Sequence, residues 1–182
     1  MPAERGTPPT ARLLHAARGR TVYSSAVVMI RRAGPGDVDE LGAIAAAAYQ
    51  KYVPRIGRAP APMTADYAQA VRDGQAWAAL EDGQIVGFAV IIAQPGYLLL
   101  DNVAVLPAAQ GRGIGARLLA LAEEQARGLG LREIRLHTNE AMTENLAYYP
   151  RHGYAETHRA EQDGFNRVFF RSNWSGAAIS RV

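Results

Sequence analysis

The chain contains no cysteine among its 182 residues. Disulfide bonds, thiolate metal sites and a cysteine nucleophile are therefore excluded, and we predict no metal site. No apolar run approaches the roughly 20 residues that a membrane-spanning helix needs, so we expect no membrane partner. Without a cysteine nucleophile, any group transfer that this chain catalyses is expected to occur by direct attack of one substrate on the other.

An excess of positive charge is found only at the start of the chain. Four of the 20 basic residues and one of the 17 acidic residues precede position 29, which leaves 16 of each sign in residues 29–182. A nucleic-acid partner is not expected, because binding a phosphate backbone requires surplus positive charge on the folded body.

The first 28 residues are rich in arginine, poor in acidic residues and interrupted by proline. They lack the clean apolar stretch of a signal peptide. We predict a disordered N-terminal extension over 1–28, with a transit peptide or an upstream start before an initiator at Met29 as alternatives. One domain is expected over 29–174 and a tail over 175–182, in a cytoplasmic protein.

The hydrophobic pattern predicts a mixed α/β (α+β) fold. We expect a strand, two helices, three strands, a helix, a strand, a helix and a closing hairpin, in that order. Asp37 is predicted to cap the first helix in a capping box and Thr64 to cap the second. The run "YLLLDNVAVL" is typical of a strand buried on both faces. The predicted sheet is mixed and mostly antiparallel, with one β-α-β crossover.

The segment "QGRGIG", Gln110 to Gly115, places three glycines between a predicted strand and a long amphipathic helix. Unpaired N–H groups and the helix dipole make a helix start suitable for phosphate. Glycine lets the backbone approach a pyrophosphate closely, and Arg112 adds a cation that can donate two hydrogen bonds. The loop therefore predicts a pyrophosphate site, with a turn that binds nothing as the structural alternative.

Two pyrophosphate-containing ligands compete for this loop, a dinucleotide and coenzyme A. Gly111, Gly113 and Ala116 match the dinucleotide fingerprint GxGxxA. The motif lies in mid-chain after a hairpin, however, and "LPAAQ" separates the strand from the first glycine, where a Rossmann turn is tight. No second mononucleotide-binding half follows. A Walker A loop is excluded because the chain has no Gly-Lys-[Ser/Thr].

On these residues the chain resembles the GNAT superfamily of acetyl-CoA-dependent N-acetyltransferases. The family's loop, [Gln/Arg]-x-x-Gly-x-[Gly/Ala], is present as "QGRGIG" after the strand-like "NVAVLP". Its second signature, a tyrosine four residues before a Gly-aromatic pair, is present as "YPRHGY", which begins at Tyr149. The resemblance covers roughly residues 29–172 and includes the order of the predicted elements.

The resemblance implies acetyl-CoA as cosubstrate, with its pyrophosphate at the glycine loop and its pantetheine arm along the preceding strand. The family commonly has asparagine seven residues before the tyrosine, where this chain has Met142. Asn139 and Asn145 are therefore alternatives for that contact. The implied cofactor-binding residues are Val103, Ala104, Val105, Gln110, Gly111, Arg112, Gly113, Ile114, Gly115, Ala116, Asn139 and Asn145.

The resemblance also implies a role for Tyr149 near the thioester sulfur. A phenol of pKa about 10 can protonate a leaving thiolate of pKa about 8.5, slightly uphill. Asp101 is the candidate base, because strand alternation would place it on the same face as Val103. We interpret His137 and His152 as structural.

The segment between the first two helices concentrates aromatic and arginine side chains in a proline-rich loop. It would suit a small amine that also carries a carboxylate or phosphate, or it is a surface loop without a binding role. The candidate substrate-binding residues are Tyr49, Tyr52, Arg55 and Met63.

The sequence thus predicts an N-acetyltransferase that moves an acetyl group from acetyl-CoA to a primary amine of a small molecule, with a peptide amine as the second choice. A non-catalytic acyl-CoA-binding module and a Rossmann-type oxidoreductase are the alternatives from other classes. A homodimer is left open.

Overall fold

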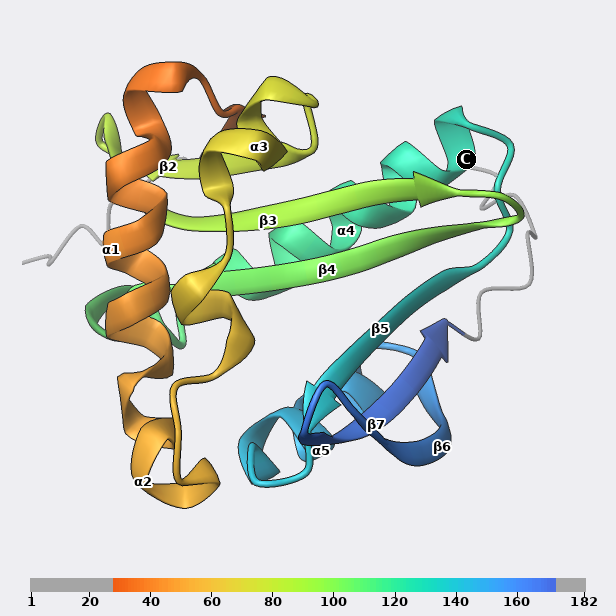
Figure 1. Cartoon of the computed structure of the whole chain (residues 1–182). Coiled ribbons are helices and arrows are strands. Elements are labelled where there is room, and N and C mark those ends of the chain that lie inside the picture. The colour runs from red at the N-terminus through yellow and green to blue at the C-terminus, as the bar shows by residue number, and fades with distance from the viewer. Residues whose placement is uncertain (1–27, 173–182) are drawn as a thin grey trace, which may run out of the picture.

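The computed structural model describes residues 28–172, which form one seven-stranded sheet with helices on both faces (Figure 1). The strand order is β1-β2-β3-β4-β5-β7-β6, and within these residues only β4 and β5 pair in parallel. The predicted fold class, a mostly antiparallel mixed sheet with one β-α-β crossover, is confirmed. The strands are β1 (Met29–Arg32), β2 (Ala76–Glu81), β3 (Gln84–Gln94), β4 (Tyr97–Val105), β5 (Ile134–Asn139), β6 (Tyr154–Gln162) and β7 (Phe165–Ser172). The predicted extension and tail lie almost entirely outside the described residues.

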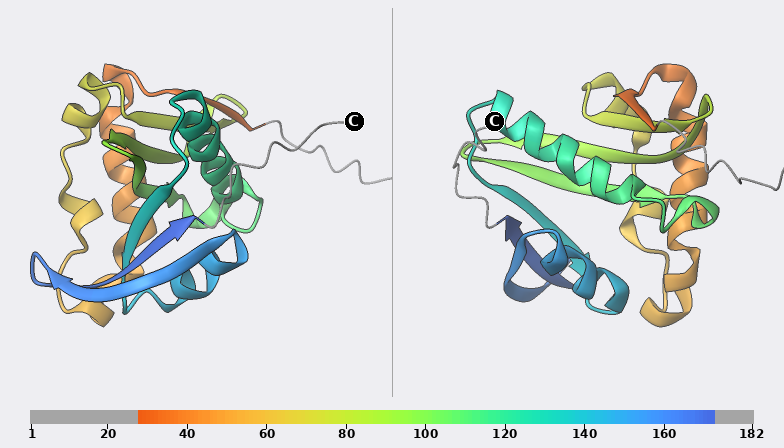
Figure 2. Two further views of the ribbon diagram at one scale, coloured as in Figure 1. Left: turned by 90° about the vertical axis from the view of Figure 1, so that its right-hand side faces the viewer. Right: turned by 180° about the vertical axis from the view of Figure 1, so that it is seen from behind.

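Two layers of helices enclose the sheet, as Figures 1 and 2 show from opposite sides. Helices α1 (Val38–Tyr49) and α3 (Tyr67–Arg72) cover one face, while α4 (Ile114–Gly128) and α5 (Thr143–Arg151) cover the other. A short helix, α2 (Val53–Ile56), and two 3-10 turns lie where the sequence predicted only a loop. None of the helices in residues 28–172 is long and apolar enough to cross a membrane.

The sheet separates between β4 and β5. The parallel pairing is limited to Leu98 with Ile134 and Leu99 with Arg135, at the first residues of both strands. Beyond this point β4 continues to Val105 without a partner on that side, while β5 turns away to pair with β7 (Figure 1). The second half of β4 therefore presents a free strand edge inside the molecule.

A β-bulge interrupts the pairing of β3 with β4. Val90 pairs with Asn102 and Ile91 with Leu100, so Asp101 is an extra residue without a partner on β3. A bulge of this kind bends its strand and redirects the side chains that follow. It lies next to the point where β4 and β5 separate.

The bulge changes which face of the sheet the side chains of β4 occupy. Leu100 packs on the α4 side and Ala104 on the α1 side. In a regular strand, residues separated by an even number of positions would lie on the same face. The alternation that we expected to place Asp101 and Val103 on one face is therefore wrong. Val103 packs on the α4 side, whereas Asp101 lines cavities beside α3. The strand is also not buried on both faces, because Asp101 is exposed.

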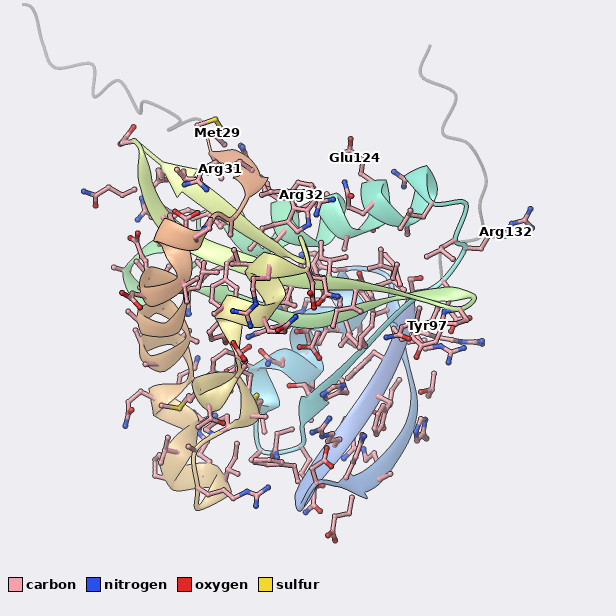
Figure 3. The ribbon with its side chains drawn as sticks, turned by 45° about the horizontal axis from the view of Figure 1, so that its top comes forward. Met29, Arg31, Arg32, Tyr97, Glu124 and Arg132 are labelled. Atoms are coloured by element: carbon pink, nitrogen blue, oxygen red, sulfur yellow. The ribbon has the colours of Figure 1, made fainter. Side chains whose placement is uncertain are left out.

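Two predicted helix caps are not formed. The Asp37 carboxylate pairs with Arg31 at 2.6 Å and makes no side-chain cap to α1. Arg31 is labelled on β1 in Figure 3. Helix α3 is capped instead by Asp66, whose side chain accepts from the Gln69 N–H at 2.8 Å. Thr64 lies two residues before this cap, at the end of a 3-10 turn.

Candidate active site

A groove opens along the free edge of β4 and extends from the first turn of α4 to α5, with a volume of about 440 Å³. Ten of the twelve predicted cofactor-binding residues line it, and Arg112 and Asn139 do not. The ten are Val103, Ala104, Val105, Gln110, Gly111, Gly113, Ile114, Gly115, Ala116 and Asn145. The structure therefore brings together in one groove most of the residues that the sequence grouped.

The glycine loop has the backbone conformation that only glycine adopts without strain. Gly111 has φ of +77° and Gly113 has φ of +80°, and a side chain at either position would meet no atom within 4 Å. Gly113 is the N-cap of α4, whose first turn lines the groove. The N-terminus of a fifteen-residue helix thus faces an open space, the arrangement that suits a phosphate.

Arg112 turns away from the groove. Its guanidinium pairs with Glu81 at the end of β2 and donates to the Ala108 carbonyl at 3.0 Å. The Glu81 carboxylate is only 11% exposed, so this ion pair anchors the loop to the β2–β3 turn.

Two backbone carbonyls on the free edge of β4 accept hydrogen bonds from side chains. The Val103 carbonyl accepts from the Tyr49 hydroxyl at 3.0 Å, and the Val105 carbonyl accepts from the Gln110 side-chain amide at 3.0 Å. These carbonyls point into the region where β5 would otherwise pair. An extended ligand that adds itself to this edge would share or replace those two hydrogen bonds.

Helix α5 forms the opposite wall of the groove. The Asn145 side-chain amide donates to the Thr138 hydroxyl at 3.0 Å, which fixes its orientation and leaves its oxygen free to accept. The Asn139 side-chain oxygen accepts from the Ala141 N–H at 2.9 Å in the turn before α5. Of the two asparagines that the sequence offered for the cofactor contact, only Asn145 lines the groove.

Sequence reasoning did not predict two further groove residues, Tyr148 and His152. Their rings lie 4.1 Å apart, and a side chain at Gly115 would come within 2.8 Å of the Tyr148 hydroxyl. They therefore stand directly over the first turn of α4. Their i, i+4 spacing on the helix of Tyr149 was a usable signal, but the sequence does not show which neighbour that face meets.

Tyr149 stands where the groove meets a second pocket. Its ring packs against Phe170 at 5.6 Å and Tyr154 at 6.0 Å between ring centres. Burial raises its pKa above the ordinary value for tyrosine, and nearby tyrosines raise it further, so the phenol stays protonated at neutral pH. Its hydroxyl makes no hydrogen bond to any residue within 28–172.

The second pocket is much smaller, about 60 Å³, and adjoins the groove on the α1 side of the sheet. Both cavities share Tyr49, Val103, Asn145 and Tyr149. Its remaining walls come from the α2 region, from β4 and β5, and from β7 across the sheet. They include Ile56, Pro60, Pro62, Asp101, Asn102, His137, Met142, Phe165 and Arg167.

A buried hydrogen-bond chain holds one wall of this pocket together. Asn102, only 6% exposed, accepts from the Tyr49 hydroxyl at 2.7 Å and donates to the Tyr67 hydroxyl at 2.8 Å. Tyr67 in turn donates to the Pro62 carbonyl at 2.6 Å. The amide after the bulge thus links α1, α3 and the segment before α3 to β4.

Three ionisable side chains lie where the second pocket meets a third cavity beside α3: Asp101, His137 and Arg167. Partial desolvation at the pocket wall raises the pKa of Asp101, although the residue keeps contact with solvent, and Arg167 opposes that rise. Burial lowers the pKa of His137 to about 4, and the Arg167 charge acts in the same direction. His137 is therefore neutral at pH 7, and its Nε2 accepts from Arg167 at 2.7 Å.

Of the four predicted substrate-binding residues, Tyr49, Tyr52 and Arg55 pack in a row, but only Tyr49 lines the second pocket. Tyr49 lines both cavities, whereas Tyr52 lines only the groove. Arg55 pairs with Glu144 at 2.8 Å, and Met63 packs against the core below α1. Much of the pocket instead comes from β5 and β7, and no local pattern shows that these distant strands meet β4 there.

The splayed sheet and the glycine loop at a helix N-terminus define an acyltransferase that takes acetyl-CoA as cosubstrate. The open groove fits this cosubstrate, because its glycines leave room for a pyrophosphate and its free strand edge leaves room for an extended arm.

The model of the acetyltransferase (GNAT) family matches residues 41–154, so the chain belongs to this family. The family resemblance noted in the sequence is thereby confirmed. A search of curated protein sequences found no match.

Solved structures share the fold at low sequence identity. PaiA N-acetyltransferase from Thermoplasma acidophilum, in complex with coenzyme A, is 17% identical with a TM-score of 0.68, covering 80% of this chain and 98% of that one. The ribosomal-protein-S18-alanine N-acetyltransferase from Escherichia coli is 18% identical with a TM-score of 0.65, covering 86% and 99%. Ard1 from Thermoplasma volcanium is 17% identical with a TM-score of 0.63, covering 79% and 95%.

Proposed function

We propose that this enzyme transfers the acetyl group of acetyl-CoA to a primary amine of a small molecule, by direct attack of the amine in a ternary complex. The observation that carries the proposal is that the groove and the second pocket, which we take as the acceptor pocket, adjoin at Tyr149 and share four wall residues. Bound acetyl-CoA would supply a thioester as the acyl donor. We expect the enzyme to work in the cytoplasm.

Tyr149 is proposed as the acid that protonates the leaving thiolate. Its phenol is neutral, and its hydroxyl has no partner in the described part of the chain, so it is available to donate. It lines both cavities, as a group between donor and acceptor must. Burial disfavours its ionised form, so we infer that the proton transfer is coupled to departure of the thiolate.

Asp101 is proposed as the base that takes the proton of the attacking amine. The bulge directs its carboxylate into the acceptor pocket, and no hydrogen bond or ion pair to the described residues occupies it. Its raised pKa makes its carboxylate a better proton acceptor than that of an ordinary aspartate. The Val103 N–H, two residues further on, is the candidate donor to the thioester carbonyl.

A contact between two segments beside the acceptor pocket supports a small acceptor over a peptide. The Arg58 guanidinium lies 3.6 Å from the centre of the Phe165 ring and donates to the Asp163 carbonyl at 2.7 Å. It joins the segment after α2 to the β6–β7 turn beside the pocket. An extended peptide passing between these segments would have to break both contacts.

The cosubstrate assignment is tested by calorimetry on two glycine variants. Gly113→Glu places a carboxylate at the start of α4, where the pyrophosphate is expected. Gly130→Glu is the matched control, because Gly130 also has positive φ and open space but follows the other end of α4. We expect Gly113→Glu to weaken acetyl-CoA binding at least about 100-fold by charge repulsion and steric exclusion, and Gly130→Glu to bind as the wild type.

Both variants should lose similar thermal stability, because a non-glycine residue in the left-handed region costs about 1–2 kcal/mol at either position. Acetyl-CoA binding by Gly113→Glu at wild-type affinity would overturn the pyrophosphate assignment. A wild-type protein that binds acetyl-CoA but releases no thiol with any amine would instead favour the non-catalytic binding module.

A further inference from the structure

We propose that the acceptor carries a carboxylate next to its amine, as α-amino acids do, and that Arg167 selects it by binding that carboxylate. The proposal rests on the proposed function and specifies its substrate class. Arg167 lies on β7, far along the chain from both family signatures, and lines both the acceptor pocket and the cavity beside α3.

The charge of Arg167 is buried and only partly compensated. Its side chain is 12% exposed, whereas its ion-pair partner Asp163, at 3.0 Å, is 68% exposed and screened by solvent. Its other partners, His137 at 2.7 Å and Gln162 at 3.5 Å, accept hydrogen bonds but are neutral and contribute no opposite charge. The Nε–H makes no hydrogen bond to the described residues, so the guanidinium retains donors for an anion.

Asp101 supplies the opposite charge at the same place. Its carboxylate is near enough to Arg167 for their charges to attract, but the two side chains do not form an ion pair within 4.0 Å. The acceptor pocket thus contains one carboxylate and one guanidinium that do not neutralise each other by contact. An ammonium and a carboxylate on one small molecule complement this arrangement.

The order of the cavities gives the acceptor an orientation. Tyr149 and Val103 mark the end of the pocket that meets the groove, Asp101 lies two residues before Val103 on the same strand, and Arg167 on β7 borders the cavity beside α3. The amine therefore points toward the groove, the carboxylate toward Arg167, and the remainder of the molecule into the outer cavity of about 310 Å³. A diamine fits less well, because its second ammonium would face Arg167.

The experiment compares matched acceptors that differ only in charge. Thiol release from acetyl-CoA is measured with the α-amino acids, and each active amino acid is then compared with its carboxamide and its decarboxylated amine. We expect the wild type to prefer the amino acid by roughly 100-fold in kcat/KM, the discrimination expected of a buried charge-assisted contact. Arg167→Gln should remove that preference by losing activity on the amino acid while retaining activity on the carboxamide.

Two further variants separate specific recognition from loss of fold or charge. Arg167→Lys keeps the positive charge but lacks the planar guanidinium that can donate two parallel hydrogen bonds to a carboxylate. It should therefore keep only part of the preference. Arg171→Gln removes the same charge from the same face of β7 but lies outside all three cavities, so it should keep the full preference. Melting temperatures show whether each variant is folded.

Three results would overturn the proposal. The wild type turns over the carboxamide or decarboxylated amine as well as the amino acid, Arg167→Gln keeps the preference, or an amine panel finds activity only on molecules without a carboxylate. Each of these leaves acetyl transfer itself intact. Failure of the proposed function would appear separately, as absence of acetyl-CoA binding by calorimetry or as absence of thiol release with every amine of the panel.

Discussion

The cosubstrate groove and the acceptor pocket meet at Tyr149, yet they are built in opposite ways. Much of the groove comes from one continuous stretch, residues 103–116, and is formed by the backbone of a strand edge, a glycine loop and a helix start. The acceptor pocket is formed by side chains from α1, the segment after α2, β4, β5 and β7. The groove should therefore depend on backbone conformation, and the pocket on individual side chains.

The first prediction tests the two regions at Tyr149, where they meet. Tyr149→Phe removes the proposed proton donor without emptying the packed site beside Phe170. We expect kcat to fall about 100-fold or more, with little change in the KM for acetyl-CoA, because positioned acids contribute roughly 10²–10⁴-fold. Steady-state kinetics with both substrates varied provide the measurement.

Tyr148→Phe is the control for this prediction. Tyr148 is adjacent on α5 and lines only the groove, so its hydroxyl should affect acetyl-CoA binding more than turnover. An unchanged kcat in Tyr149→Phe would remove Tyr149 from the acid role. Equal loss of kcat in both variants would mean that the groove and the pocket are not separable at this helix.

The contrast also explains how far the sequence could predict the site. The groove was predictable because its residues are local: a strand, a glycine loop and a helix follow one another, and the positive φ at Gly113 requires glycine. The fold class followed from the order of elements for the same reason. Arg167 was not predictable, because the pairing of β5 with β7 brings it beside His137 from 30 residues away.

Asp101 shows a different limit. The sequence identified the residue, but strand alternation assigned it the wrong face, because a one-residue bulge leaves no signature in the hydrophobic pattern. The predicted caps at Asp37 and Thr64 failed in a similar way. Aspartate and threonine both suit a helix cap. Contacts made in the folded structure, such as the ion pair between Asp37 and Arg31, decide whether the side chain caps the helix.

The second prediction concerns stability and the wall of the acceptor pocket. Asn102→Ala would leave the Tyr49 and Tyr67 hydroxyls without their buried partner. We expect a loss of about 2–3 kcal/mol in the free energy of unfolding, measured by urea denaturation, because two buried hydrogen bonds and the packing of the amide are lost, while each hydroxyl keeps only a backbone carbonyl as partner. The KM for the acceptor should rise more than the KM for acetyl-CoA, since the chain reaches the Pro62 carbonyl in the pocket wall.

Asn166→Ala is the matched control for Asn102→Ala. The Asn166 side chain donates to Glu140 at 2.7 Å, but this bond is exposed and water can replace it. Its removal should change the free energy of unfolding by less than about 0.5 kcal/mol. A similar loss in both variants would show that the buried chain does not hold the pocket wall, and that the pocket is less dependent on its side chains than we infer.

The smallest expected effect comes from replacing His137, which tests whether this part of the pocket wall excludes water. The pKa of His137 is about 4 in the folded protein, against an ordinary value of 6.5 for the unfolded chain. Between these values the unfolded chain binds more protons, so stability is present above pH 6.5 and is lost as the pH falls toward 4. From pH 7 to pH 5 this group should contribute a loss of about 2 kcal/mol.

Urea denaturation at pH 7 and pH 5 should therefore show a smaller difference for His137→Gln than for the wild type. His158→Gln, which removes an exposed histidine from β6, should keep the wild-type difference. Protonation of His137 at Nε2 would also cost it the hydrogen bond from Arg167, so the two side chains are coupled. If His137→Gln keeps the full pH dependence, the place where the acceptor pocket meets the cavity beside α3 is open to solvent. Arg167 would then bind a carboxylate more weakly than its burial implies.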